Sequence, residues 1–295
     1  MKITDMTRDY LEKFGCQKES FADLLEAAER LDGNTEAREK LLCHINNYKE
    51  GKLDFEVLTA DSAKSAELVG IHKYTAAFIF YVALVPYALP YFEAVGLSET
   101  EWYDSMIDFR WKLEECYKCY GIWGTFVDWF GAFYTADRVA FGRLQFNLAE
   151  AVADYNSENF DIKKGDTVVA IHIPSDTRTP FSRENREAAY EKASKFFAPK
   201  FKDGKVIFRC GTWLLHPAHR QILPEKSNIR SFLDDFELDE SSFKETDSNI
   251  WRLFYVRDYN GDPDTLPEET SLMRIYKEFI KAGGKLGSLT GYRKG

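Results

Sequence analysis

The sequence predicts an α+β or α/β chain in two parts: an all-helical domain over residues 1–137 and a mixed-sheet domain over residues 138–295. Apolar residues in the first part recur at the three- and four-residue spacing of a helix face. From about Val139 the pattern changes to short β-branched runs separated by helical segments. Gly131 and the polar segment Thr135 to Arg138 place the boundary near residues 131–140.

Helix-start residues divide the first part into elements. Ser20 is a candidate N-cap for a helix whose apolar face contains Phe21, Leu24, Leu25, Ala28 and Leu31. Asn34 or Thr35 begins the next helix. Ser98 and Glu101 have the spacing of a capping box, and they begin a long helical segment.

The stretch from Tyr74 to Phe92 contains no charged residue and is long enough to cross a membrane as a helix. Pro86 and Pro90 lie in its second half, and each lacks a backbone hydrogen-bond donor. We therefore expect a buried core helix that bends or ends at the prolines. A membrane span is the alternative interpretation.

The second part begins with two predicted strands and a helix. The segment VAFGRLQFNL (139–148) is the first predicted strand. The continuous β-branched run TVVAIHIP (167–174) is typical of a strand that is buried on both faces. Ser182 is expected to cap the helix that follows, and KVIFRCGTWLL (205–215) is the next strand.

The remaining elements continue this alternation of strands and helices. A short helix is expected around His216 to Leu223, and Ile250 to Val256 is a strand candidate. Gly283 and Gly284 end a further helix, whose apolar face contains Leu272, Ile275, Tyr276, Phe279 and Ile280. The tail KLGSLTGYRK (285–294) is the last predicted strand. This order predicts a mixed sheet.

Composition limits the possible classes of function. The net charge is −9, which repels phosphate backbones, so we expect no nucleic-acid partner. Five cysteines in a chain of this length indicate reduced thiols rather than a disulfide framework. The polar segment MKITDMTRDYLEKFG at the beginning has no signal-peptide core. We expect a cytoplasmic protein without membrane association.

Several segments of the second part are informative as an ordered set. WFGAFYTADR (129–138) is followed closely by GRLQFNL (142–148), and DTVVAIHIPSD (166–176) leads into the Ser-capped helix. CGTWLLHPAHRQILPEKSNIRSFLDDFEL (210–238) and LPEETSLMRIYKEFIKAGGKLGSLTGY (266–292) complete the set. Together they resemble a bacterial family with a helical N-acyltransferase N-terminal domain and a GNAT-like C-terminal domain. The resemblance covers most of the chain.

This resemblance implies a GNAT-like fold and acyl transfer from acyl-CoA, as co-substrate, to a small amine. In a GNAT site two parallel strands splay around the pantetheine arm, and the pyrophosphate binds at the N-terminus of the next helix. Residues 167–174 and 205–215 are then the splayed strands. The implied cofactor-binding residues are Ile173, Pro174, Ser175, Thr177, Arg178, Ser182 and Arg183.

Two features of this region bear on the implied cofactor. From Asp176 to Arg209 there are nine Lys or Arg residues and five Asp or Glu residues, which suits an anion, although a solvated charged face is the alternative. The usual GNAT phosphate loop contains glycines, whereas IPSDTRTPFSRE (173–184) contains none. Either side chains replace backbone donors here, or CoA is bound unconventionally. In the latter case the chain is a non-catalytic binding or regulatory module with a GNAT-like fold.

Direct transfer from a thioester to an amine requires a base and an acid. His172, at the end of the first splayed strand, is the candidate base, since the unperturbed pKa of histidine is about 6.5. Tyr255 is the candidate acid. Cys210 is a candidate nucleophile in an alternative, cysteine-based mechanism. An ordinary packing role is the competing interpretation for all three.

The remaining candidates concern the substrate pocket and metals. Candidate pocket walls are Trp213, His216, Trp251 and Tyr292, with core filling as the alternative. The pairs 216/219 and 116/119 have His-x-x-His and Cys-x-x-Cys spacing but lack further ligands, so no metal site is expected. Serine-hydrolase, P-loop and Rossmann motifs are missing from the sequence.

Overall fold

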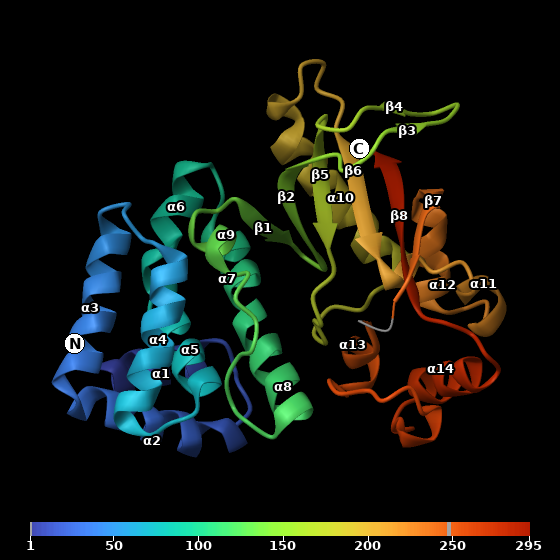
Figure 1. Ribbon diagram of the computed structural model, residues 1–295. Coiled ribbons are helices and arrows are strands. Elements are labelled where there is room, and N and C mark those ends of the chain that lie inside the picture. Colours follow the sequence, from blue (N-terminus) through green and yellow to red (C-terminus); the bar gives the residue numbers. More distant parts are fainter. Residues whose placement is uncertain (1, 247–248) are drawn as a thin grey trace. The chain divides into compact units, whose positions relative to one another are not determined.

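The computed structural model describes residues 2–246 and 249–295, which form two compact units, Met1–Val139 and Ala140–Gly295 (Figure 1). The first unit is helical, and the second contains a mixed sheet with helices. The predicted fold class, an all-helical domain followed by a mixed-sheet domain, is therefore confirmed.

The N-terminal unit consists of packed helices around an aromatic core. Its α-helices are α1 (Ile3–Lys13), α2 (Glu19–Gly33), α3 (Thr35–Lys49), α4 (Phe55–Val69), α5 (Lys73–Val82), α6 (Leu89–Ala94), α7 (Glu99–Met106), α8 (Asp108–Tyr120) and α9 (Gly131–Tyr134). The rings of Phe109 and Phe130 stack at 4.1 Å in this core, and Tyr134 donates to the carbonyl of Tyr81 at 2.8 Å.

Two of the three helix caps predicted in the N-terminal unit are confirmed. Asn34 accepts a hydrogen bond from the backbone N–H of Ala37 at 3.0 Å, and Ser98 forms a capping box with Glu101. The predicted Ser20 cap is wrong. Helix α2 begins at Glu19, and the buried Ser20 hydroxyl donates to the carbonyl of Gln17 at 2.7 Å. Its hydroxyl therefore serves the preceding turn instead of the helix N–H groups.

The uncharged stretch from Tyr74 to Phe92 is interrupted as predicted. Helix α5 ends at Val82, and a 3₁₀ turn, η1 (Val85–Tyr87), and helix α6 follow. Pro86 and Pro90 each lie in the first turn of one of these elements, where a missing N–H costs no helical hydrogen bond. Over residues 2–246 and 249–295, no helix combines the length and apolarity that crossing a membrane requires.

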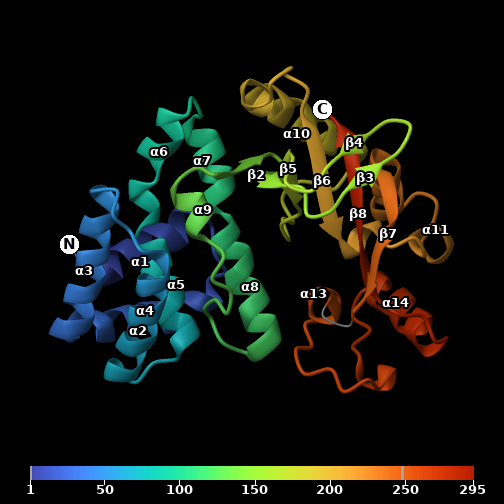
Figure 2. The ribbon, with the colours of Figure 1, turned by 45° about the horizontal axis from the view of Figure 1, so that its top comes forward.

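The C-terminal unit contains a sheet with six strands among the described residues (Figures 1 and 2). Its order is β1-β2-β5-β6-β8-β7. Strands β5 and β6 are parallel, whereas the pairs β2/β5, β6/β8 and β7/β8 are antiparallel. The strands are β1 (Arg138–Phe141), β2 (Leu144–Glu150), β5 (Thr167–His172), β6 (Ile207–Thr212), β7 (Glu237–Glu245) and β8 (Gly287–Lys294). A small arm, β3 (Tyr155–Asn156) and β4 (Asp161–Ile162), pairs with itself.

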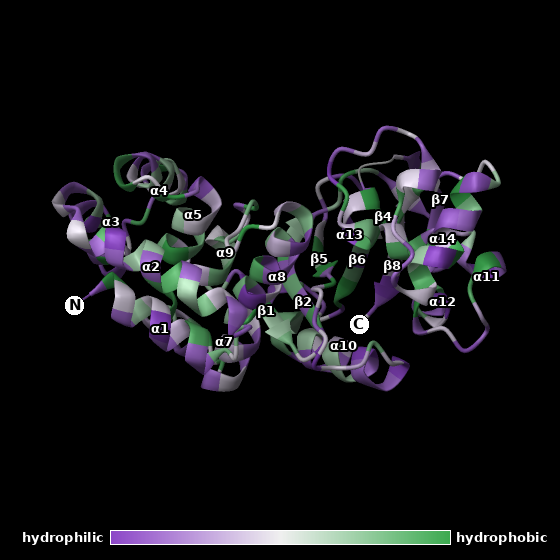
Figure 3. Cartoon of the chain, turned by 90° about the horizontal axis from the view of Figure 1, so that it is seen from below, coloured by the Kyte–Doolittle hydropathy of each residue, from purple (hydrophilic) through white to green (hydrophobic). Residues whose placement is uncertain are grey.

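The helices of this unit connect the strands. They are α10 (Arg183–Phe197), α11 (His219–Ile222), α12 (Asn228–Phe232), α13 (Ile250–Phe254) and α14 (Ser271–Lys281), with 3₁₀ turns η2 (Ala198–Lys200), η3 (Trp213–Leu215), η4 (Leu233–Asp235) and η6 (Pro263–Thr265). Helix α10 packs on the sheet, because the ring of Tyr190 contacts those of Phe146 and Phe208. The strands beneath it, β5 and β6, are largely hydrophobic (Figure 3).

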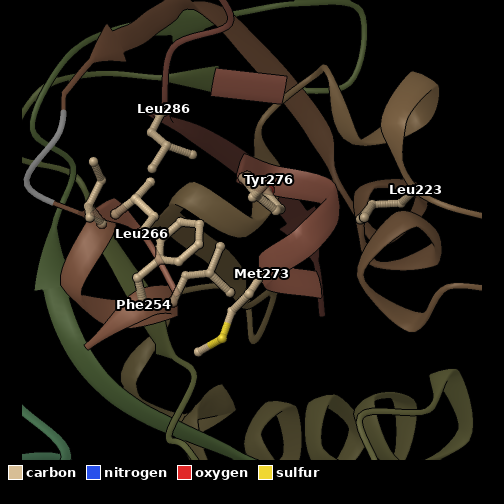
Figure 4. Close-up of a cluster of buried hydrophobic side chains, with 8 residues drawn as sticks. Leu223, Phe254, Leu266, Met273, Tyr276 and Leu286 are labelled. Carbon is tan, nitrogen blue, oxygen red and sulfur yellow. The ribbon is translucent and has the colours of Figure 1, made fainter. Parts of the chain in front are cut away.

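Some strand predictions are wrong. The strand predicted over Ile250–Val256 is helix α13, whose buried residues Ile250, Leu253 and Phe254 have helical spacing. This helix ends at Phe254, and its C-cap Tyr255 has φ 59°. The apolar faces of α13 and α14 meet in a second hydrophobic cluster (Figure 4), which consists of Leu223, Ile250, Leu253, Phe254, Leu266, Met273, Tyr276 and Leu286. The segment 139–148 is a pair of strands joined at Gly142, which has φ 60°. Residues 213–215 form η3 and are not part of the predicted strand.

Candidate functional site

The parallel strands β5 and β6 separate at their carboxyl ends. They pair at Val169 with Phe208 and at Ala170 with Arg209, and no further pair joins them in the described chain. Each strand nevertheless stays paired with its outer neighbour, β5 with β2 as far as His172 and β6 with β8 as far as Thr212. The sheet therefore opens between two strands whose outer edges are held, which is the splayed arrangement that the sequence resemblance implied.

A loop that begins at Pro174 joins the opened end of β5 to helix α10. Pro174 accepts a hydrogen bond through its carbonyl oxygen from Arg143 Nη1 at 2.8 Å. The buried carboxylate of Asp176 accepts from the backbone N–H of Arg178 at 2.7 Å and from its Nε at 3.3 Å. At the far end, Arg186 Nη1 donates to the carbonyl of Phe181 at 2.9 Å. The loop is thus held by side chains at both ends.

Helix α10 begins directly after this loop with a capped N-terminus. The Ser182 hydroxyl accepts from the backbone N–H of Asn185 at 3.3 Å, so the predicted Ser182 cap is confirmed. The other N–H groups of a first helical turn have no partner within the helix, and the helix dipole adds positive potential there. The start of α10 therefore has the chemistry of an anion site at the end of the splayed strands.

The predicted cofactor-binding residues lie along the loop and the first turn of α10. Half-buried among them are Ile173, Pro174 and Ser182, whereas the exposed ones are Ser175, Thr177, Arg178 and Arg183. Several of the cations counted in the sequence form ion pairs: Arg178 with Asp176, and Arg183 with Glu187 at 4.0 Å. These ion pairs reduce the excess positive charge at the start of the helix.

His172 is the last residue of β5, at the mouth of the splay. Its Nε2 lies 2.6 Å from Oδ1 of Asn147 on β2. The Asn147 amide is oriented by its Nδ2, which donates to the carbonyl of Leu148 at 2.7 Å. Because the oxygen faces the ring, the neutral imidazole carries its proton on Nε2 and has its basic lone pair on Nδ1. The hydrogen bond to Asn147 thus fixes the orientation of the ring at the end of β5.

Both parts of the chain match known protein families. A family model described as the GNAT-like C-terminal domain matches residues 139–293, and one described as the N-acyltransferase N-terminal domain matches residues 5–136. The chain belongs to this GNAT-like family. No curated protein matches the sequence.

Solved structures of acyltransferases share the fold of the whole GNAT-like chain. An acyltransferase in complex with decanoyl-CoA and teicoplanin has a TM-score of 0.69 and 19% identity, covering 98% of this chain and 87% of that one. A mutant acyltransferase in complex with octanoyl-CoA has a TM-score of 0.70 and 18% identity, covering 98% of this chain and 88% of that one. At these identities the likeness shows the fold.

Cys210 of the GNAT-like domain lies beside the opened strands. It is fully buried, and its Sγ lies 3.8 Å from the carbonyl oxygen of Ile171 across the gap. Burial raises the pKa of this thiol to about 12, so the thiol stays protonated at neutral pH. Since the thiolate is the nucleophilic form, this environment favours a packing role.

Replacing Cys210 by serine is therefore expected to leave any acyl transfer within about threefold of the parent rate, since the protonated thiol is not the nucleophilic form. The measurement is the initial rate of CoA release in the presence of acceptor. Cys43, an exposed cysteine of the N-terminal unit, is the matched control in Cys43→Ser. A loss of about a thousandfold in Cys210→Ser alone would instead support the cysteine-based mechanism.

The other predicted residues do not all lie together, although Tyr255 and Trp213 pack against the same hydrophobic cluster. Tyr255 is the C-cap of α13 and packs against the second cluster. Trp213 contacts Tyr276 edge to face at 5.7 Å, the Trp251 ring lies under two guanidinium groups, and the buried Tyr292 stacks on Tyr155 at 4.6 Å. These four aromatic residues do not share one cluster, and their predicted roles in acid catalysis and in the substrate pocket stay predictions.

His216 lines an open pocket of about 400 Å³ between α11, β7 and α14. The pocket is lined by His216, Pro217, Ala218, Gln221, Phe243, Glu245, Phe279, Gly283 and Lys285. His216 Nδ1 accepts from the backbone N–H of Ala218 at 3.1 Å, and burial lowers the pKa of its ring. Among residues that the structure describes, no group of three or more His, Cys, Asp or Glu could hold a metal ion.

His219 is the fully buried member of the His-x-x-His pair. Its Nδ1 donates to the carbonyl of Leu214 at 3.0 Å, and its Nε2 accepts from the Tyr276 hydroxyl. Burial lowers the pKa of His219 to about 4. The ring is therefore a neutral, structural link between α11 and α14.

His219 should make folding stability depend on pH. In the unfolded chain the His219 ring binds a proton below about pH 6.5, whereas in the folded chain it does so only below about pH 4. The free energy of unfolding is therefore highest above pH 6.5 and decreases as the pH falls from 6.5 to 4. Between pH 6.5 and pH 4 the loss in the free energy of unfolding is on the order of 3 kcal/mol. Urea unfolding between pH 4 and 7 measures it. His219→Gln should flatten the curve, and an unchanged slope in that variant would contradict the assignment.

Sequence analysis missed the residues that hold the loop, namely Arg143, Asp176, Asn185, Arg186 and Asp235. A lone arginine beside a strand or within a charged helix has no distinguishing local pattern. The glycine-free loop itself was the available signal, because a loop without glycine needs another source of backbone order.

Proposed function

We propose that this chain is an acyl-CoA-dependent N-acyltransferase that transfers an acyl group to a small amine. The observation that carries the proposal is the opening between β5 and β6, which leads into the capped N-terminus of α10. The acyltransferases that share this fold were solved with decanoyl-CoA, octanoyl-CoA or CoA, two of them also with teicoplanin or 10C-teicoplanin. We further propose a cytoplasmic location and no nucleic-acid partner.

In this proposal residues 1–137 form a helical domain and residues 138–295 form the catalytic domain. The pantetheine arm lies in the gap between β5 and β6, where it pairs with backbone groups that no longer pair with each other. The pyrophosphate lies at the loop and at Ser182 and Arg183, where helix N–H groups and the dipole favour an anion.

The chemical step then needs no covalent enzyme intermediate. The amine nitrogen bonds to the thioester carbonyl carbon, the C–S bond breaks, and CoA leaves as a thiolate. His172 accepts the amine proton through Nδ1, and Tyr255 is the proposed donor of a proton to the thiolate. The oriented imidazole at the mouth of the splay supports the first of these roles.

Ligand stabilisation tests the proposal directly. Decanoyl-CoA at 100 times its Kd adds about 2.7 kcal/mol of stability, which corresponds to a rise in Tm of about 4 °C for a chain of this size. The measurement compares the thermal midpoint with decanoyl-CoA, CoA and no ligand. If neither decanoyl-CoA nor CoA changes Tm at millimolar concentration, the enzymatic proposal fails and the chain is a non-catalytic module with a GNAT-like fold.

A further inference from the structure

Arg143 contacts the loop that connects β5 to α10. It follows Gly142 in the turn between β1 and β2, and only 8% of its surface is exposed. Its Nη1 donates to the carbonyl of Pro174, and its guanidinium lies over the ring of Phe181 at 5.0 Å. One side chain therefore contacts both the first and the last residue of the loop.

The charge of Arg143 is only partly balanced by the fold. Within the described chain no carboxylate lies at ion-pair distance from it, and its buried Nε has no hydrogen-bond partner. Burial lowers the pKa of the guanidinium, and the nearby Asp176 partly reverses this. Asp176 itself is hydrogen-bonded to Arg178. A buried cation with an unused donor is costly unless it serves another partner.

The carbonyl groups at both ends of the loop are turned toward protein side chains. Pro174 is bound by Arg143, Pro180 by Asn185 Nδ2 at 2.9 Å, and Phe181 by Arg186. The described chain contains no cis peptide bond, and in a trans peptide unit the N–H points opposite to the C=O. The N–H groups of the residues that follow these three carbonyls therefore point away from the side chains, namely those of Ser175, Phe181 and Ser182.

We propose that Arg143, with Asn185 and Arg186, replaces the glycines of a conventional phosphate loop by holding loop carbonyls from beneath and so turning the opposite N–H groups toward the CoA pyrophosphate. This inference rests on the proposed function and goes further, because it assigns the order of the loop to a positioning residue outside the loop. The buried guanidinium also supplies positive charge beneath the diphosphate.

Two thioesters separate this role from a general effect on folding. Decanoyl-CoA carries the pyrophosphate, whereas decanoyl-pantetheine has the same acyl chain and pantetheine arm without it. Their Kd values are measured by calorimetry for the wild type and for Arg143→Met, Arg143→Lys and the control Arg230→Met. Arg230 is also a partly buried arginine that donates to a main-chain carbonyl, that of Leu223, but it lies outside the loop.

The proposal expects Arg143→Met to weaken decanoyl-CoA binding by about 10- to 30-fold and decanoyl-pantetheine binding by less than about twofold. Arg143→Lys keeps the charge and one donor, so it should lose only about threefold for decanoyl-CoA. Arg230→Met should leave both affinities unchanged. If Arg143→Met does not fold, the Arg143→Lys ratio between the two ligands decides the question.

Other outcomes contradict the inference. Equal losses for both thioesters would make Arg143 a structural residue, and unchanged decanoyl-CoA binding in Arg143→Met would show that the loop is ordered without it. Wild-type protein that binds decanoyl-CoA no more tightly than decanoyl-pantetheine would also overturn the inference, while leaving the acyltransferase proposal intact. Wild-type protein that binds neither thioester would overturn both proposals.

Discussion

Replacing His172 by alanine is expected to lower kcat for acyl transfer by about a hundredfold to ten-thousandfold, the usual contribution of a general base. The ring is the last side chain of β5, where the strand separates from β6, and Asn147 holds its Nε2 proton at 2.6 Å. In the proposed mechanism this ring accepts the proton of the attacking amine. The measurement is the rate of CoA release at saturating decanoyl-CoA and acceptor.

The comparison of two variants distinguishes catalysis from packing. His172→Ala should retain the Kd for decanoyl-CoA within about twofold, because His172 belongs to β5 and is not one of the residues proposed to bind the pyrophosphate. Asn147→Ala leaves the imidazole in place and removes only its orienting partner, so a loss of about tenfold is expected. Comparable losses in Kd and kcat, or a decrease of less than threefold in His172→Ala, would show that His172 only packs between the strands.

Several features of the fold could be predicted from the sequence because their signals are local. The run TVVAIHIP is continuous and β-branched, and it forms the central strand β5 with four consecutive buried residues. Ser182 precedes a polar first turn and caps α10 as predicted. Pro86 and Pro90 cannot donate a backbone hydrogen bond inside a helix, so a single continuous helix over the uncharged stretch is excluded and each proline lies in the first turn of a new element.

The errors arose where tertiary contacts determine local structure. Strand β7 (Glu237–Glu245) is rich in charged and polar residues, and it is a strand because it pairs with the β8 edge. Five residues of α13 are too few for their helical spacing to be recognised among β-branched and aromatic neighbours. Likewise, the contact between Arg143 and Pro174 joins residues 31 positions apart, and no sequence pattern marks it.

Replacing Asp235 by alanine is expected to destabilise the protein by about 3–5 kcal/mol, because it leaves a buried cation without its counterion. The side chains of Arg186 and Asp235 are both fully buried, and Nε and Nη2 donate to the two carboxylate oxygens at 2.6 and 3.1 Å. Tyr190 donates to the same carboxylate at 3.1 Å. Removing Asp235 therefore takes the acceptor from three buried donors on α10, of which only Arg186 Nη2 keeps another partner, Ser231.

The double variant Arg186→Met with Asp235→Leu tests that explanation. It removes both charges together, so it should be more stable than Asp235→Ala, although the Tyr190 hydroxyl remains unpaired. Urea unfolding of the single and double variants gives the difference, with Asp234→Ala as the control, because Asp234 forms a half-exposed ion pair with Arg220. A double variant that is no more stable than Asp235→Ala would show that the cost comes from lost packing.

Arg186 also holds the carbonyl of Phe181, so the double variant should lose affinity for decanoyl-CoA even if its stability recovers. This result would separate the contribution of the ion pair to folding from the proposed contribution of Arg186 to the loop.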